Sequence, residues 1–249
     1  MANPTITPTR PMDTQSAEPG GAGPAFRAGL PLLLWLSPAF PVGSFAYSHG
    51  LEWAVEAGEI SDAATLRAWL ADLLDFGAPR SDCVLFSCAF RATRSADWAD
   101  LRELNLLAVA LAGSAERRLE TCAQGTAFVA TMRAAWDCPS LARLPTGGGD
   151  PVAFPVAVAV ATAGHGLELE IALQAFALAL FANLVSAAVR LGAIGQTDGQ
   201  KVLAAMLPAV RRLAGETLGA GVDDLGGCAF RSDIAAMRHE TQYSRLFRS

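Results

Sequence analysis

The stretch IALQAFALALFANLVSAAV, Ile171 to Val189, decides the fold class of this chain. It contains no charged side chain, and it is bounded by Glu168 and Glu170 on one side and Arg190 on the other. Alanine and leucine dominate it, which favours a helix over a strand. A helix that is apolar on every side is either a membrane span or the central helix of a soluble bundle.

Polar residues and a neighbouring segment favour the second of these alternatives. The stretch is just long enough to cross a bilayer, but it holds Gln174, Asn183 and Ser186 in its interior. A second apolar segment, Val152 to Ala163, comes shortly before it, as expected for two buried helices that pack together. The sequence therefore favours a soluble core helix.

Helical segments separated by turn residues are expected on both sides of this stretch. After a short helix that ends at Ser37, the patterns predict helices at residues 44–57, 62–77, 81–92, 95–111, 114–137, 152–163, 171–189, 197–214 and 232–240. Pro139 to Asp150 should be a mobile loop, and Gly215 to Gly227 a glycine-rich connection. The expected fold is all-α, a single-domain bundle of about ten helices at residues 29–249.

Three of these helices carry more specific expectations. Ser61 and Asp62 should cap a helix that buries Leu66, Trp69, Leu70, Leu73 and Leu74. The long helix after Ser114 should cross much of the domain, with Leu119, Cys122, Ala123, Thr126 and Ala130 at helical spacing. Thr197 and Gln200 match a capping box, and Pro208 should either kink the helix that follows or open a new one.

Residues 1–28 are predicted to be a disordered tail, because they are rich in proline and glycine and lack an apolar period. Gly29 to Leu36 resembles the apolar core of a secretory signal. It follows a long tail, however, and continues directly into a densely specified turn that signal cleavage would destroy. We therefore expect no secretory signal.

Composition limits the partners and the compartment. The net charge of −5 and the isoelectric point near 5.2 argue against nucleic-acid binding, which needs a concentrated basic face. The five cysteines are odd in number and form no CxxC pair, which suits buried thiols in a reducing compartment. We expect a cytoplasmic protein without disulfides and without a membrane partner.

No catalytic or ligand-binding motif is complete. Gly195 to Val202 lacks the glycine spacing and the hydroxyl of a phosphate-binding loop, and no GxSxG nucleophile motif occurs. His49, His165 and His239 lie far apart, and the His49–Glu52 pair is typical of a surface hydrogen bond. Metal ligands paired across the axis of a symmetric dimer stay possible.

The segment SPAFPVGSFAYSHGLE, Ser37 to Glu52, is specified in unusual detail for a region without catalytic residues. Its prolines forbid a continuous helix, Gly43 permits a tight turn, and Ser44 can cap the helix that follows. The aromatic residues Phe40, Phe45 and Tyr47 should be partly exposed there. This composition favours a contact surface for another protein.

The C-terminal segment is the second predicted interaction element. It combines aromatic, aliphatic and guanidinium groups, the types enriched at binding hot spots: Tyr243, Arg245, Leu246, Phe247 and Arg248. The alternative is that this end of the chain packs back on its own domain.

Three stretches in order resemble the UreF family of urease accessory proteins. They are Ser37 to Glu52, VSAAVRLGAIGQTDGQ at Val185 to Gln200, and MRHETQYSRLFRS at Met237 to Ser249. The resemblance implies an all-helical, dimeric and non-enzymatic protein that binds UreD (UreH in some organisms), the GTPase UreG and the urease apoprotein. It also implies that nickel and GTP are handled by the whole complex and that this chain alone binds no cofactor tightly.

The resemblance and the residue types together predict two groups of partner-binding residues. The UreG side would comprise Phe40, Phe45, Tyr47, His49, Glu52, Arg190, Gln196 and Gln200. The UreD side would comprise Tyr243, Arg245, Leu246, Phe247 and Arg248, of which Arg245 corresponds to a family residue implicated in that contact. Phe45 stands where some relatives carry tyrosine.

Two alternatives stay open from the residues alone. Arg190 could simply cap the carbonyls of its own helix or could be recognised by a partner. The apolar helices between Val152 and Val189 could also bind a hydrophobic small molecule or a lipid.

Overall fold

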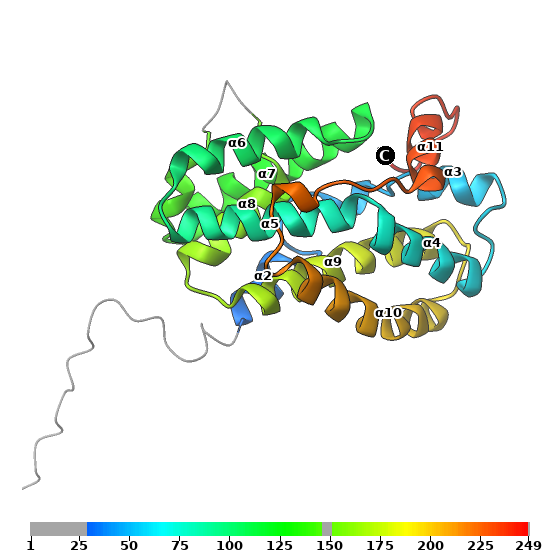
Figure 1. Cartoon of the computed structure of the whole chain (residues 1–249). Helices are drawn as coiled ribbons and strands as arrows, with labels where there is room; N and C mark the ends of the chain where they lie inside the picture. Colours follow the sequence, from blue (N-terminus) through cyan, green and yellow to red (C-terminus); the bar gives the residue numbers. More distant parts are fainter. Residues whose placement is uncertain (1–28, 146–150, 249) are drawn as a thin grey trace, which may run out of the picture.

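The computed structural model describes residues 29–145 and 151–248, and within these ranges the chain is helical with no strand (Figure 1). The predicted all-α bundle of about ten helices is confirmed. The predicted disorder of residues 1–28 lies outside the described residues, as do the consecutive glycines of the predicted mobile loop. The start of that loop is ordered, because Pro139–Arg143 forms a short 3-10 helix.

The elements follow one another with short connections. The α-helices are α2 (Leu30–Trp35), α3 (Leu51–Glu56), α4 (Ala63–Phe76), α5 (Ala78–Arg94), α6 (Trp98–Ala110), α7 (Ala115–Ala135), α8 (Phe154–Gly164), α9 (Leu169–Arg190), α10 (Gln196–Thr217) and α11 (Phe230–His239). The 3-10 helices are η1 (Ser44–Ala46), η2 (Pro139–Arg143) and η3 (Val222–Asp224).

Helix α5 is the centre of the bundle, in contact with α4, α6, α8, α9 and α10. Figure 1 shows α6, α7 and α8 grouped on one side of α5, and α4, α9 and α10 on the other. Helices α3 and α11 pack against each other at one end, where the C-terminus also lies. This end is built from segments that are distant in the sequence.

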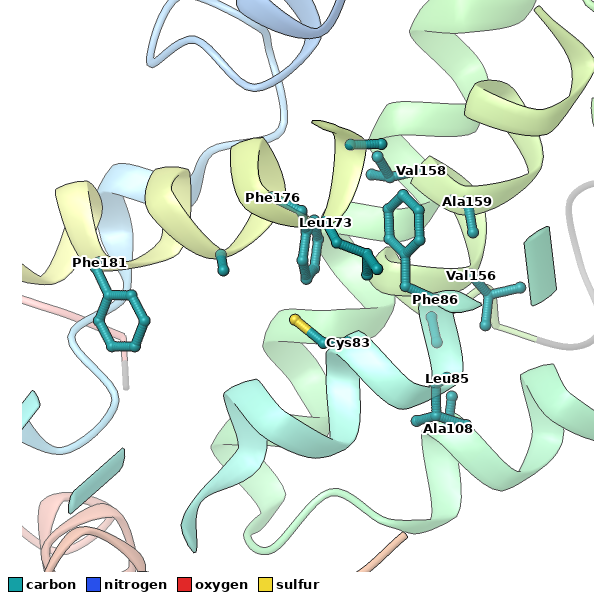
Figure 2. Close-up of a cluster of buried hydrophobic side chains, with 14 of the residues drawn as sticks. Cys83, Leu85, Phe86, Ala108, Val156, Val158, Ala159, Leu173, Phe176 and Phe181 are labelled. Atoms are coloured by element: carbon teal, nitrogen blue, oxygen red, sulfur yellow. The ribbon is translucent and has the colours of Figure 1, made fainter. Parts of the chain in front are cut away.

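The core between α5, α8 and α9 is tightly packed (Figure 2). Phe86 of α5 and Phe176 of α9 are in contact, with ring centroids 5.4 Å apart and ring planes tilted by 51°. Helix α8 is buried from Pro155 to Ala163, and its alanines let neighbouring backbones come close. The closest approach is at Gly125 of α7, where a Cβ atom would lie 2.0 Å from the carbonyl oxygen of Val152.

Helix α9 contains the stretch that decides the fold class. In the described residues it is the one helix long and apolar enough to cross a membrane, a test that the core helix of a soluble bundle also passes. About half of its most apolar window is buried inside the structure, and it packs against α3, α5 and α10. Its position is that of a core helix.

The predicted capping of α4 is confirmed. The Asp62 carboxylate accepts a hydrogen bond from the Thr65 amide at 2.8 Å, and the Thr65 hydroxyl satisfies the Asp62 amide in return. The predicted apolar face is buried as well: Leu66, Trp69, Leu70, Leu73 and Leu74.

The single helix predicted at residues 44–57 is wrong. Ser44–Ala46 forms η1, the chain is extended at Tyr47, and α3 starts only at Leu51. Left-handed backbone at His49 (φ 56°) and Gly50 (φ 74°) interrupts the helix. Ser44 is therefore no cap.

Gly50 also sets how closely two elements approach. A Cβ atom at this position would lie 2.5 Å from the backbone nitrogen of Ala236 in α11. A left-handed glycine without a side chain is thus required both for the turn and for the contact with α11.

Helix α10 differs from its prediction at both ends. It begins at Gln196 after Gly195 with no side-chain cap, so the predicted capping box at Thr197 is wrong. The helix runs unbroken through Pro208 to Thr217, which excludes a new helix at the proline. Pro208 lies on the exposed face, where water can satisfy the carbonyl that loses its partner.

The buried face of α7 is not the one formed by the residues at helical spacing noted in the sequence. Leu119 is 56% exposed, and Thr126 and Ala130 face solvent. The buried face instead begins with polar groups and becomes apolar further along: Glu120, Gln124, Gly125, Phe128, Val129 and Met132. The first turns of α7 therefore bring charge into the interior, which requires compensating partners.

Candidate functional site

The structure brings together two segments that are distant in the sequence, residues 37–52, here called the corner, and residues 240–248, here called the tail. The Glu52 carboxylate accepts hydrogen bonds from the backbone amides of Leu246 at 2.6 Å and Phe247 at 2.9 Å. The Arg248 amide donates to the carbonyl of Ala46 at 2.7 Å. The tail thus packs on its own domain, which is the alternative to a free interaction element that the sequence left open.

Arg190, at the end of α9, joins the same two segments. Its guanidinium donates a hydrogen bond to the Phe45 carbonyl at 2.7 Å and lies 4.4 Å from the centroid of the Phe247 ring. Its contact with its own helix, Nε to the Ser186 carbonyl, is longer at 3.4 Å. Its main contacts are therefore to the corner and the tail, and burial lowers its pKa.

His239 lies fully buried between two carboxylates. Its Nδ1 is 2.7 Å from Glu116 Oε2, and its Nε2 is 3.0 Å from Glu52 Oε2. An ionised carboxylate only accepts hydrogen bonds, so the ring can donate to both only when both nitrogens carry a proton. The geometry therefore corresponds to an imidazolium ion between two negative charges.

Arg245 completes this arrangement. Its guanidinium pairs with the other oxygen of Glu116 at 2.7 Å. Two carboxylates and two cations then balance in charge, and one carboxylate also holds the tail backbone. We call the four residues Glu52, Glu116, His239 and Arg245 the tail clasp.

A second charged cluster lies one turn further along α7. His49 Nε2 is 2.8 Å from Glu120 Oε1 and 2.6 Å from a guanidinium nitrogen of Arg117, which also pairs with Glu120. Nε2 carries at most one proton, so it either donates to Glu120 or accepts from Arg117. Gln124 donates to Glu120 at 2.9 Å.

Burial and charge shift the pKa values of this cluster in opposite directions. Burial lowers the pKa of His49, and the adjacent Arg117 lowers it further. Burial alone would raise the pKa of Glu120, but Arg117 and His49 together bring it down to about 2. The cluster therefore holds an ionised carboxylate beside a histidine whose protonated form is disfavoured by burial.

The predicted partner-binding residues divide by exposure. The exposed ones are Phe45, Arg190, Gln196, Gln200, Tyr243, Arg245, Leu246 and Arg248. The buried ones are Tyr47, His49, Glu52 and Phe247, while Phe40 is half-buried with its ring 5.3 Å from that of Phe128.

The expected exposure of Tyr47 is therefore wrong, and Phe247 points into the domain although a partner contact was predicted for it. Tyr47 is 3% exposed because the extended backbone after η1 turns its ring inward. Phe247 is 4% exposed because Glu52 and Arg190 draw the tail onto the domain. Phe45, Tyr243 and Leu246 are the large hydrophobic side chains of the two segments that are exposed to solvent.

The predicted His49–Glu52 surface pair is also wrong. Each residue instead pairs with a side chain distant in the sequence, His49 with Glu120 and Glu52 with His239. Neither Glu116 nor Glu120 was predicted as a site residue. The one signal in the sequence that could have indicated them is that Glu116, Glu120 and Gln124 are spaced four residues apart, which places them on one face of a helix.

No group of three or more His, Cys, Asp or Glu residues that could hold a metal ion occurs in the part of the chain that the structure describes. His49 and His239 lie in separate clusters, each neutralised by its own partners. His165 packs elsewhere, against Trp35 with ring centroids 5.1 Å apart. The site is thus a set of internal ion pairs beneath an exposed apolar surface.

Comparison with a family model and with known proteins gives the same family. The UreF family model matches residues 60–207 of the chain. The chain is 53% identical over 238 residues to the urease accessory protein UreF of Xanthobacter autotrophicus strain Py2, covering 92% of this chain and 98% of the relative. It is 51% identical over 218 residues to the protein of the same name from Rhodopseudomonas palustris strain HaA2, covering 88% and 92%.

Proposed function

Since the chain belongs to the UreF family of urease accessory proteins, we propose that it is a non-catalytic scaffold in urease maturation. In this proposal it binds UreD (or UreH) through the tail and the GTPase UreG through the corner. As a cytoplasmic homodimer it supports GTP-dependent nickel insertion into the urease apoprotein. Nickel is the cargo of the complex, and this chain supplies no catalytic atoms.

One observation carries the proposal, namely that the corner and the tail form a continuous surface although they lie at opposite ends of the chain. If one partner binds the tail and another binds the corner, each partner would hold in place the segment that the other partner contacts. Such an arrangement couples the two binding events energetically. Apolar side chains exposed beside guanidinium groups are typical of protein-binding hot spots.

The UreD assignment is tested at the exposed part of the tail. Leu246 is 64% exposed, so Leu246→Ala removes a contact surface without opening the core. We expect weaker co-purification with UreD and unchanged helicity by circular dichroism. Leu207→Ala, an exposed leucine on α10, is the matched control and should bind UreD normally.

Deletion of residues 242–249 is the stronger version of this test. It removes the buried Phe247 as well, so we expect a modest loss of stability in addition to loss of UreD binding. Unchanged co-purification after the deletion would contradict the assignment of the tail to UreD.

The UreG assignment is tested at Phe45, which is 62% exposed. Phe45→Ala should reduce recruitment of UreG to the purified complex with UreD. Phe76→Ala changes a phenylalanine at the end of α4 that is 56% exposed, and it should have no effect. Equal recruitment by both variants would show that the corner has only a structural role.

The function as a whole is tested in cells that carry a urease operon lacking its own copy of this gene. Co-expression of the chain should restore the nickel content and the activity of urease. Purified chain alone should not hydrolyse GTP, and turnover by the chain alone would contradict the non-catalytic role.

The alternative function, binding of a lipid or a large hydrophobic molecule, has less support. Helix α8 is packed on all sides, and the cavity beside α9 measures about 70 Å³. Pockets for drug-sized ligands are typically several times larger.

A further inference from the structure

The tail is held on the domain mainly by polar contacts. Among residues 240–248 only Phe247 has a buried side chain, and the large side chains of Tyr243 and Leu246 are exposed. The inner face of α11, which leads into the tail, consists of small side chains and one histidine: Ser232, Ala235, Ala236 and His239. Little apolar area is therefore available to fix the tail, so its position depends on the hydrogen bonds and ion pairs beneath it.

His239 links the two carboxylates that bind the tail. Glu52 Oε2 accepts a hydrogen bond from the Phe247 amide at 2.9 Å and lies 3.0 Å from His239 Nε2. On the other side of the ring, Nδ1 lies 2.7 Å from Glu116, which also pairs with Arg245 of the tail. No part of the His239 side chain is exposed. A change at this ring is therefore felt by both of the carboxylates that hold the tail.

The charge of His239 decides whether this arrangement is stable. An imidazolium ion donates to both carboxylates, whereas a neutral ring has one N–H group, so one carboxylate would face a nitrogen lone pair at hydrogen-bond distance. Loss of the proton also leaves the negative charges of Glu52 and Glu116 against the single positive charge of Arg245. Both effects favour detachment of the tail, which would let water reach the carboxylates.

The other charged groups around His239 do not compensate for its charge. Among the residue types of the tail clasp, histidine is the one whose charge changes most readily with pH in the physiological range. Four further charged side chains lie on the elements packed around His239, and each is engaged elsewhere: Glu56 with Gln242, Arg117 with Glu120 and His49, Arg238 with the Trp53 ring, and Glu240 with the Ala115 amide.

We propose that the tail clasp is a proton-dependent latch. The tail is held on the domain while both ring nitrogens of His239 carry a proton, and it is released when the ring loses one of them. Because the protonated ring stabilises the docked tail, the tail is docked at lower pH and released as the pH rises. The latch is a property of the free chain and does not depend on the assignment of the tail to UreD.

The test follows two NMR signals of the full-length chain while the pH is raised from about 6 to about 9. The Cε1 proton of His239 reports the ionisation of the ring and can be assigned, since the chain has three histidines. The carbonyl carbon of Phe247 reports whether the tail is docked. We expect both signals to change with the same midpoint. The ratio of docked to released tail should fall by roughly 10- to 100-fold, the range expected for loss of one hydrogen bond to a charged group.

The variant His239→Gln separates the proton from the hydrogen-bonding side chain. Glutamine can donate to a carboxylate but never carries the charge, so the tail should be released at every pH in this range. His165→Gln is the matched control, because His165 packs against Trp35 and makes no contact with the tail clasp. It should leave the response of Phe247 unchanged. Circular dichroism shows whether each variant is folded, and the comparison of the two wild-type signals needs no variant.

Four outcomes would overturn the proposal. They are a tail that stays docked after His239 has lost its proton, a tail that is released while His239 is still protonated, a His239→Gln tail that responds to pH as the wild type does, and a His239 that keeps both protons up to about pH 9. The first would mean that the packing of Phe247 holds the tail without the tail clasp, and the last that the tail clasp is a fixed ion pair.

Discussion

Replacing His239 by alanine should destabilise the protein strongly, because it removes the cation between two buried carboxylates. The ring makes two hydrogen bonds to charged groups, at 2.7 Å to Glu116 and 3.0 Å to Glu52. Bonds of this kind each contribute about 1.5–3 kcal/mol. Removing one partner of a buried ion pair costs about 3–5 kcal/mol, since the remaining charge is left uncompensated.

Urea unfolding followed by tryptophan fluorescence measures this loss, with linear extrapolation to zero denaturant. We expect the free energy of unfolding of His239→Ala to fall by about 3–5 kcal/mol. Lys201→Ala is the control. It breaks an exposed pair with Asp198 at 2.9 Å and should cost less than about 1 kcal/mol.

A double-mutant cycle separates the ion pair from general packing. Glu52→Gln removes one of the charges that His239 balances. The double variant should therefore be more stable than the sum of the single losses predicts, by about 1–3 kcal/mol. Additive losses, or a loss below about 1 kcal/mol for His239→Ala, would refute the tail clasp as an energetic unit.

Three further predictions concern other parts of the fold. Gly125→Ala should destabilise the folded protein by more than about 3 kcal/mol or prevent folding, because the alanine Cβ would lie 2.0 Å from the Val152 carbonyl oxygen. A melting temperature within a few degrees of that of the wild type would contradict this close approach. Burial raises the pKa of Asp82 to about 6, so the wild type should lose stability as the pH rises from 4 to 6, where this carboxyl ionises in the folded protein. Asp82→Asn should therefore be more stable than the wild type at pH 8, by up to about 3 kcal/mol, and equally stable near pH 4. Urea titrations that give the same pH dependence for both proteins would rule this out. Arg190→Ala should lower the free energy that holds the tail on the domain by about 1–2 kcal/mol, which hydrogen exchange would detect as faster exchange of the Phe247 amide. Unchanged exchange would mean that the guanidinium does not hold the tail.

The helices could be predicted from the sequence where the apolar pattern decides burial. Helix α9 is apolar on all sides and lies at the core, and α4 has one apolar stripe and buries it. The same reasoning failed for α7, because its first buried residues are charged and its Leu119 is exposed. Apolar periodicity cannot identify a helix face whose burial depends on neutralisation by distant residues.

Backbone geometry at the corner was predicted only in part. The sequence showed that Pro38, Pro41 and Gly43 would shape a turn, but not that the turn would continue to Gly50. His49 adopts a left-handed conformation, which histidine seldom does without tertiary support. Its contacts with Arg117 and Glu120 supply that support.

The sequence by itself determined the all-helical class and the core position of α9, and it predicted the corner and the tail as interaction elements, because these depend on local composition and spacing. Only the tertiary structure decided that the two segments meet and that His239 lies between Glu52 and Glu116. His239 and Glu52 are 187 positions apart, and no local pattern relates them. A buried charge is tolerated only where the fold brings its counter-charge within hydrogen-bond distance, so these partners become visible only once the helices have packed.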